Sequence, residues 1–96
     1  MTPDALRHAG RLVARDYRLD DAAVVMVGCI AASGRPGSAV PSAEERAELL
    51  CIAESSDGIE RFIEAATSRA VQFASARWPM ILAHAERLAA EMAAVA

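Results

Sequence analysis

A long stretch of helical periodicity near the end of the chain constrains the fold more than any other feature of the sequence. Between Asp57 and Met92 the apolar residues recur at intervals of three and four, along one face of an α-helix. Trp78-Pro79 interrupts the stretch, because Pro79 lacks an amide proton and its ring crowds the carbonyl four residues earlier. Since the apolar register continues, we expect one helix kinked at Pro79, with a break into two helices as the alternative. The face consists of Ile59, Phe62, Ile63, Ala66, Ala70, Phe73, Ile81, Leu88 and Met92.

Two further helices are predicted from start signals. Thr2-Pro3-Asp4 combines a capping hydroxyl, a proline at the first helical position and an acid in the first turn, and it opens a helix to about Tyr17. Ser42-Ala43-Glu44-Glu45 matches the capping box and opens a helix to Ala53. Asp57 is predicted to cap the long final helix in the same way.

The apolar run Ala22–Ala32 is ambiguous, because nearly every position is apolar and periodicity cannot separate a buried helix from a buried strand. Its length, the preceding Asp20-Asp21 and the glycine after it favour a capped central helix. The β-branched cluster within Val24–Val27 favours a strand. We expect a helix, and a loop at Ser33–Pro41, which contains glycine and proline.

Alanine is the commonest apolar residue of the chain, and its small side chain determines how closely the helices can pack. Of the 96 residues, 23 are Ala, which is the best helix former but fills little core volume. We therefore expect residues 1–96 to form one domain, a compact all-α bundle of four helices, or five if the last one breaks at Pro79. Its helices are expected to approach closely around a thin core.

The charge and cysteine content restrict the classes of function. A net charge of −3 argues against general affinity for nucleic acid or an anionic membrane. We see no signal peptide, and the longest apolar run is too short to cross a bilayer, so a cytoplasmic protein is expected. Cys29 and Cys51 stand in apolar contexts without metal-ligand spacing and are predicted to be free, buried thiols.

Catalytic equipment is sparse. His8 and His84 lie on separate predicted helices, and neither has a ligand at the spacing that preorganises a helical metal site. The Ser33–Gly37 segment lacks the lysine and the spacing of a phosphate-binding loop and is read as a turn. We therefore predict no enzyme activity, no metal and no cofactor.

Charged faces are the remaining candidates for a site. Arg7, Arg11, Arg15 and Arg18 recur at helical spacing and form a predicted stripe that is either a solvated face, a protein-binding surface or, less favoured, a nucleic-acid contact. An acidic face is either solvated or directed at a basic partner. It consists of Glu44, Glu45, Glu48, Glu54, Glu60 and Glu64.

Trp78 is the only tryptophan, and it stands at the expected kink. Its side chain is predicted either to fill the kink or to anchor a partner, since tryptophan is enriched at interface hot spots.

One family resemblance covers two short stretches. The first stretch is Ala9-Gly10-Arg11-Leu12-Val13-Ala14, which is followed by an apolar run and a capped helix. The second is Arg77-Trp78-Pro79-Met80-Ile81, which precedes a Leu/Ala-rich tail. In this order the segments resemble small proteins related to the peptidase domain of AAA-type zinc metalloproteases. In that family a His-Glu-Ala-Gly-His motif supplies two zinc ligands and the general base. The matching positions here read Arg7-His8-Ala9-Gly10-Arg11, so the resemblance implies a helical relative without zinc or hydrolysis.

These patterns together predict a small helical module that acts by binding another protein, or a second copy of itself as a homodimer. The alternatives are a phage or mobile-element inhibitor that offers its acidic face to a nucleic-acid-binding complex, a zinc-free metallopeptidase remnant, and nucleic-acid binding through the arginine stripe. No small-molecule substrate is indicated. The predicted partner-binding residues are Arg7, Arg11, Arg15, Arg18, Glu60, Glu64 and Trp78.

Overall fold

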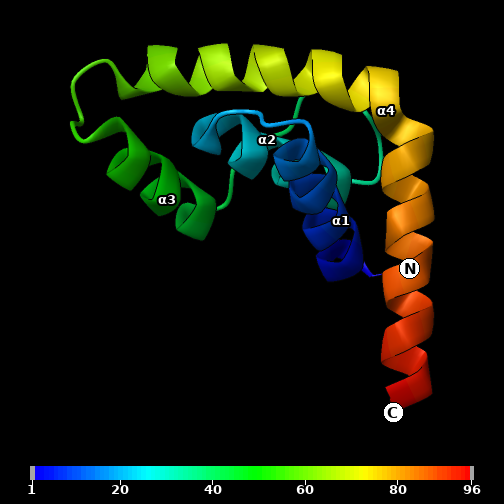
Figure 1. The fold of residues 1–96 in the computed structure, drawn as a ribbon. Coiled ribbons are helices and arrows are strands. Elements are labelled where there is room, and N and C mark those ends of the chain that lie inside the picture. The colour runs from blue at the N-terminus through cyan, green and yellow to red at the C-terminus, as the bar shows by residue number, and fades with distance from the viewer. Residues whose placement is uncertain (1, 96) are drawn as a thin grey trace.

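The computed structural model describes residues 2–95, and all regular secondary structure in that range is helical. The helices are α1 (Pro3–Asp16), α2 (Asp21–Ala32), α3 (Ala43–Ala53) and α4 (Ile59–Val95). In Figure 1, α1 and α2 pack beneath the first half of α4, α3 leans outward at one end, and α4 turns sharply at the other. The all-α prediction is confirmed, and the ambiguous apolar run is the central helix α2.

The predicted start signals of the first three helices are confirmed by their hydrogen bonds. The Thr2 hydroxyl accepts from the Ala5 amide at 3.2 Å, and the Asp20 carboxylate accepts from the Ala23 amide at 2.9 Å. At α3 the capping box is complete, because the Ser42 hydroxyl accepts from the Glu45 amide and the Glu45 carboxylate accepts from the Ser42 amide.

The predicted cap of the last helix is wrong. The Gly58 carbonyl accepts the first helical hydrogen bond of α4, from the Phe62 amide at 3.0 Å, and Gly58 has a φ of 70°. Asp57 instead donates its own amide to the Ser55 hydroxyl at 3.1 Å. The glycine supplies the left-handed backbone that turns the chain into α4, so an aspartate cap is not needed.

Two glycines let α1 and α2 approach closely. A Cβ atom on Gly10 would lie 2.8 Å from the Ala31 Cβ, and one on Gly28 would lie 2.7 Å from the Arg11 Cγ. Neither position has room for a larger side chain without a shift of its neighbours. This contact confirms the expected thin packing, and it fixes α2 in the centre, where Met26 and other side chains are fully buried.

The long helix α4 consists of two helical segments that meet at a kink, so it lies between the bent helix and the broken one that the sequence left open. Arg77 departs from helical geometry, with φ −122° and ψ 20°, two residues before Pro79. The bend lies there because the Pro79 ring crowds the carbonyl of Ser75. Two contacts hold the bend: the Ser75 hydroxyl donates to the Pro36 carbonyl at 3.2 Å, and the Arg77 guanidinium lies 4.1 Å from the centre of the Tyr17 ring.

The apolar face of α4 is buried along most of its length. Phe73 is only half-buried, because the neighbouring Ala74 takes the enclosed position. Met92 is 59% exposed, since the end of α4 extends past the other helices (Figure 1). None of the helices within residues 2–95 combines the length and apolarity needed to cross a bilayer. The enclosed residues of α4 are Ile63, Ala66, Ala70, Ala74, Ile81 and Ala85.

Candidate functional site

The predicted arginine stripe is partly engaged within the molecule. Arg7 pairs with Asp4 at 2.9 Å and lies 3.4 Å from the Glu45 carboxylate. Arg11 forms a two-pronged contact with Glu48, at 3.0 and 3.1 Å. The contacts with Glu45 and Glu48 join α1 to α3, so half of the predicted stripe serves to hold two helices together.

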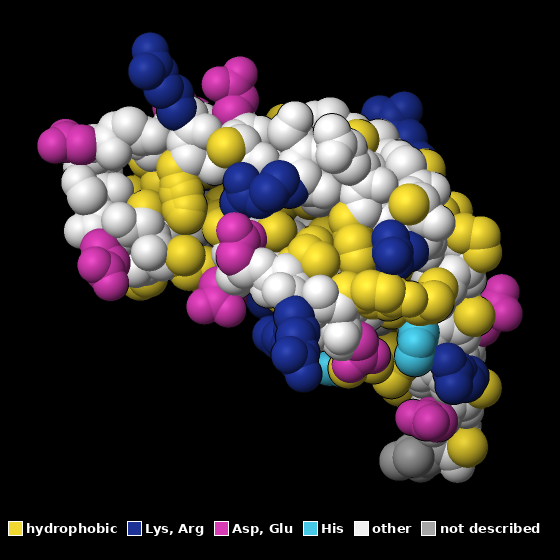
Figure 2. Space-filling view, turned by 45° about the horizontal axis from the view of Figure 1, so that its top comes forward, with side chains coloured by type: hydrophobic (Ala, Val, Ile, Leu, Met, Phe, Trp, Pro, Cys, Tyr) yellow, Lys and Arg dark blue, Asp and Glu magenta, His cyan; other side chains and the backbone are white. Residues whose placement is uncertain are grey.

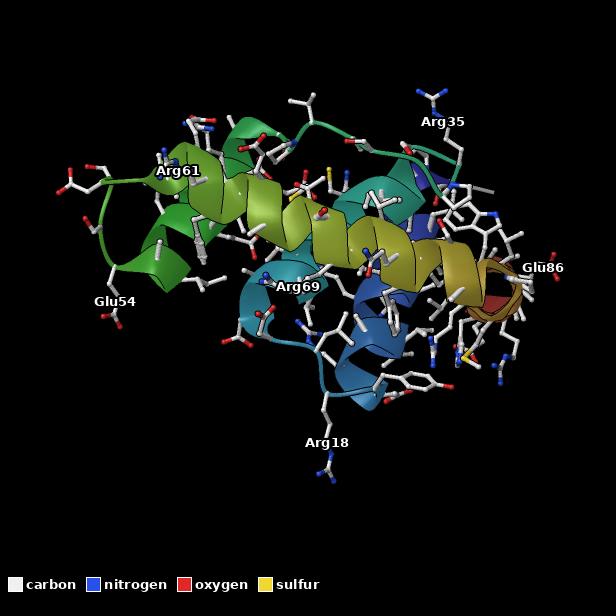
Figure 3. The ribbon with its side chains drawn as sticks, turned by 90° about the horizontal axis from the view of Figure 1, so that it is seen from above. Arg18, Arg35, Glu54, Arg61, Arg69 and Glu86 are labelled. Atoms are coloured by element: carbon white, nitrogen blue, oxygen red, sulfur yellow. The ribbon has the colours of Figure 1, made fainter. Side chains whose placement is uncertain are left out.

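The other two arginines of the stripe differ from this pattern. Arg15 is exposed near the end of α1. Arg18 lies beyond the helix in a left-handed conformation, with φ 60°, and points into solvent (Figure 3). The prediction that Arg18 continues the helical face is wrong, because α1 ends at Asp16, one residue earlier than expected.

The sequence places Glu45 on an acidic face that is either solvated or directed at a basic partner. In the structure its side chain is buried instead, and the residue is only 4% exposed. Its carboxylate bends back to the Ser42 amide, which directs the side chain toward the junction of α1, α2 and α3. The second carboxylate oxygen has no hydrogen-bond partner, although the Arg7 and Arg11 guanidiniums lie 3.4 and 4.0 Å away. The capping box therefore places a charge at this junction, and two arginines compensate it.

Cys29 adjoins this buried carboxylate. Its thiol donates to the Val40 carbonyl at 3.4 Å. Burial, together with the negative charge of Glu45, raises the pKa of the Cys29 thiol to about 11. The group is thus protonated at neutral pH, the opposite of what a cysteine nucleophile requires. Cys51 is exposed, so the prediction that both thiols are buried holds for Cys29 alone.

The two histidines lie apart. His8 is exposed on α1, and the ring of His84 contacts Arg87 within α4 at 3.1 Å. Within residues 2–95, no group of three or more His, Cys, Asp or Glu side chains is arranged to hold a metal ion.

The main apolar patch on the face seen in Figure 2 lies below the first half of α4, among scattered charged side chains. Two arginines of α4 contact residues outside that helix. Arg69 pairs with Asp20 at 2.8 Å, and Arg77 stacks on Tyr17 and, at 5.0 Å, on Phe73. Arg77 therefore makes cation–π contacts with both rings, while Tyr17 stays 45% exposed.

Trp78 is half-buried and packs against the core beside the bend, which agrees with its predicted role of filling the kink. Met80, two residues further along the chain, is 40% exposed. An anchoring role for Trp78 stays a prediction.

The opposite side of α4 carries a groove. The irregular segment Ser38–Pro41 runs alongside the first half of α4, away from Arg69 and Arg18 (Figure 3). The groove has a volume of about 710 Å³. It brings together the two acidic residues predicted on this helix. Its lining comprises Ser38, Ala39, Val40, Pro41, Arg46, Glu60, Glu64, Thr67, Ser68, Val71 and Gln72.

The acidic residues of the groove differ in their contacts. Glu60 pairs with Arg46 of α3. Glu64 is exposed and takes part in none of the ion pairs formed among residues 2–95. The groove therefore holds one unpaired carboxylate beside one that is paired at the surface.

Val40 is the residue of the groove that sequence reasoning missed. It is 90% exposed, more than any other large apolar residue that the structure places on the surface. The sequence does contain a feature that could have marked Val40 as a candidate, because it is the one large aliphatic residue of the glycine- and proline-containing loop. An isolated apolar residue in such a loop has no periodic neighbours and therefore contributes nothing to a helix- or strand-based reading.

Comparison of the chain with protein-family models, with curated proteins and with solved structures finds no match.

Proposed function

We propose that this protein is a non-enzymatic interaction module that binds another protein in the groove between Ser38–Pro41 and the first half of α4. The observation that carries this proposal is the 90% exposure of Val40 on the rim of that groove. When a partner covers a large aliphatic side chain next to a concave surface, the burial of apolar area lowers the free energy of the complex.

Two features of the site support a binding role over a catalytic one. The Cys29 thiol, the buried nucleophile nearest the groove, is held protonated by its surroundings. The sequence also favours a binding role, because the stretch that resembles the metallopeptidase motif has Arg7 and Arg11 in place of that family's zinc-binding histidines.

The intramolecular pairing of Arg7 and Arg11 supports placing the binding surface on α4 rather than on α1. An arginine that already holds a carboxylate must give up that contact before it grips a phosphate. In the groove, Glu64 takes part in none of the ion pairs formed among residues 2–95, so it can bind a partner without that cost.

The test is an affinity purification from the native host with three forms of the protein. The wild type is compared with Val40→Asp, which places a charge on the groove rim, and with Ala83→Asp, a matched change at an exposed position on the second half of α4. Circular dichroism first establishes that all three are folded.

The expected result is a partner that the wild type and Ala83→Asp retain and Val40→Asp loses. Recovery of the same proteins by all three forms, or of none by any, contradicts the proposed function. A wild-type protein that recovers only its own second copy, with no effect of Val40→Asp, contradicts it as well.

A further inference from the structure

The chemistry of the groove specifies the kind of segment that fits it. We infer that the partner contributes an extended segment in which an apolar residue is followed closely by Arg or Lys, with the apolar side chain against Val40 and Val71 and the basic one on Glu64. This inference rests on the proposed function and names the chemistry of its partner.

The apolar part of the groove lies between the loop and α4. Ala39, Val40 and Pro41 form one wall, and Val71 of α4 lies opposite. None of the loop residues of this wall is charged. A partner side chain can therefore cover them without removing water from a charged group of the loop. The pocket is therefore suited to an aliphatic or aromatic side chain.

The acidic part lies further toward the start of α4. Glu64 precedes Val71 by seven residues, which places the two on the same side of the helix about two turns apart. Glu60 lies one turn earlier still, and its surface pair with Arg46 is of the exposed kind that contributes little to stability. A basic side chain of the partner can thus pair with Glu64 and compete with Arg46 for Glu60.

The loop also offers hydrogen-bonding groups to an extended chain. The amides of Ser38, Ala39 and Val40 donate no backbone hydrogen bond to the part of the chain that is described. An extended segment laid along the loop can accept hydrogen bonds from whichever of these amides face it, as in the recognition of peptides by exposed strand edges. A helical partner has no free backbone groups for them, which favours an extended one.

The cysteine behind the loop holds this wall in place. The Cys29 thiol donates to the Val40 carbonyl from inside the molecule, so the side chain of Val40 is left on the outer surface. The groove is therefore formed before the partner arrives, and less ordering is needed on binding.

The experiment is a selection from a displayed library of short random peptides, with the full chain as the target. Wild type, Glu64→Arg and the control Ala83→Arg are used in parallel, after thermal unfolding has shown that they are equally stable. The inference predicts that wild type and Ala83→Arg enrich peptides with an apolar residue followed by Arg or Lys, and that Glu64→Arg enriches Asp or Glu at the second position. For a selected peptide followed by fluorescence anisotropy, Glu64→Arg should weaken binding about tenfold, as expected for about 1.4 kcal/mol.

Selection of the same peptides by Glu64→Arg and wild type overturns the inference. Val40→Asp is carried through the same selection, and an enrichment that it leaves unchanged overturns the inference as well. The proposed function has a separate readout: if Val40→Asp loses a host protein while Glu64→Arg keeps it with undiminished affinity, the groove binds a protein but the basic-segment inference is wrong.

Discussion

The two halves of α4 share one apolar register but are covered differently. Before the bend at Arg77, the inner face is enclosed by α1 and α2, as at Ala70, and the outer side borders the groove with Ser38–Pro41. After the bend, burial is complete at Ile81 but has ended at Met92. The helix has the same periodicity throughout, so the extent of the other helices decides what is buried.

This difference teaches that a helical pattern predicts which side chains could be buried, whereas the neighbouring elements determine which of them are. It also separates two kinds of surface. The first half of α4 carries a groove with a second wall, and the second half ends as a single helix (Figure 1). Substitutions on the two halves should therefore have unequal effects.

The largest contrast is expected from truncating the inner face of the second half. Ile81→Ala should lower the free energy of unfolding by about 2–5 kcal/mol, because it leaves a cavity in a fully enclosed place. Met92→Ala removes a side chain that is 59% exposed and should change stability by less than about 0.5 kcal/mol. Urea denaturation measures both, and equal losses would show that the end of α4 is covered.

Enlarging a small residue gives the next contrast. Ala70→Leu forces extra atoms into the enclosed face of the first half and should cost about 1–3 kcal/mol. Ala90→Leu makes the same change at an exposed position of the second half and should be nearly neutral. Thermal unfolding of the pair tests this, and a neutral Ala70→Leu would mean that α4 packs less tightly on α2 than described.

A pH dependence is expected for the thiol that holds the groove loop. The pKa of Cys29 is raised from 9.0 to about 11 on folding, so the unfolded chain releases this proton first as the pH rises. The contribution of the Cys29 thiol to the free energy of unfolding is therefore fully present below pH 9. It declines between pH 9 and about pH 11, with a slope of at most about 1.4 kcal/mol per pH unit. Cys29→Ala should flatten this part of the curve, and an unchanged slope in Cys29→Ala would assign it to other groups.

The smallest effect is expected at the junction of the two halves. Arg77→Ala removes the guanidinium that stacks on Tyr17 and Phe73, and it should cost about 0.5–1 kcal/mol. Arg77→Lys retains the charge but not the planar stack, and it should recover part of the loss. Chemical denaturation compares the three proteins, and an Arg77→Ala protein as stable as wild type would show that the stack on Tyr17 and Phe73 contributes nothing to stability.

The sequence predicted the helices well because their signals are local. The capping box at Ser42 and the proline at Pro79 act through neighbouring backbone atoms, and both determine structure where they stand. Burial was predicted less well. Glu45 was assigned to a solvated face, yet its return to the Ser42 amide carries it into the junction with α1, a consequence that depends on where α3 docks.

The candidate site was predicted only in part. Glu60 and Glu64 were identified from their spacing on one helix, and they do line the groove. The other wall comes from Ser38–Pro41, about twenty residues earlier in the chain, and no periodic pattern connects a loop to a helix. Val40 can be recognised as a groove residue only once the structure shows this loop beside α4.

The most direct test compares one exposed residue on each half of α4. In a Cys51→Ser background, Ser68→Cys places a thiol in the groove and Ala83→Cys places one on the second half. The rate of maleimide labelling is measured for each, in the purified protein and in an extract of the native host. Slower labelling at position 68 in the extract, with an unchanged rate at position 83, is the predicted result. Equal rates at position 68 in both conditions would contradict the binding of a partner in the groove.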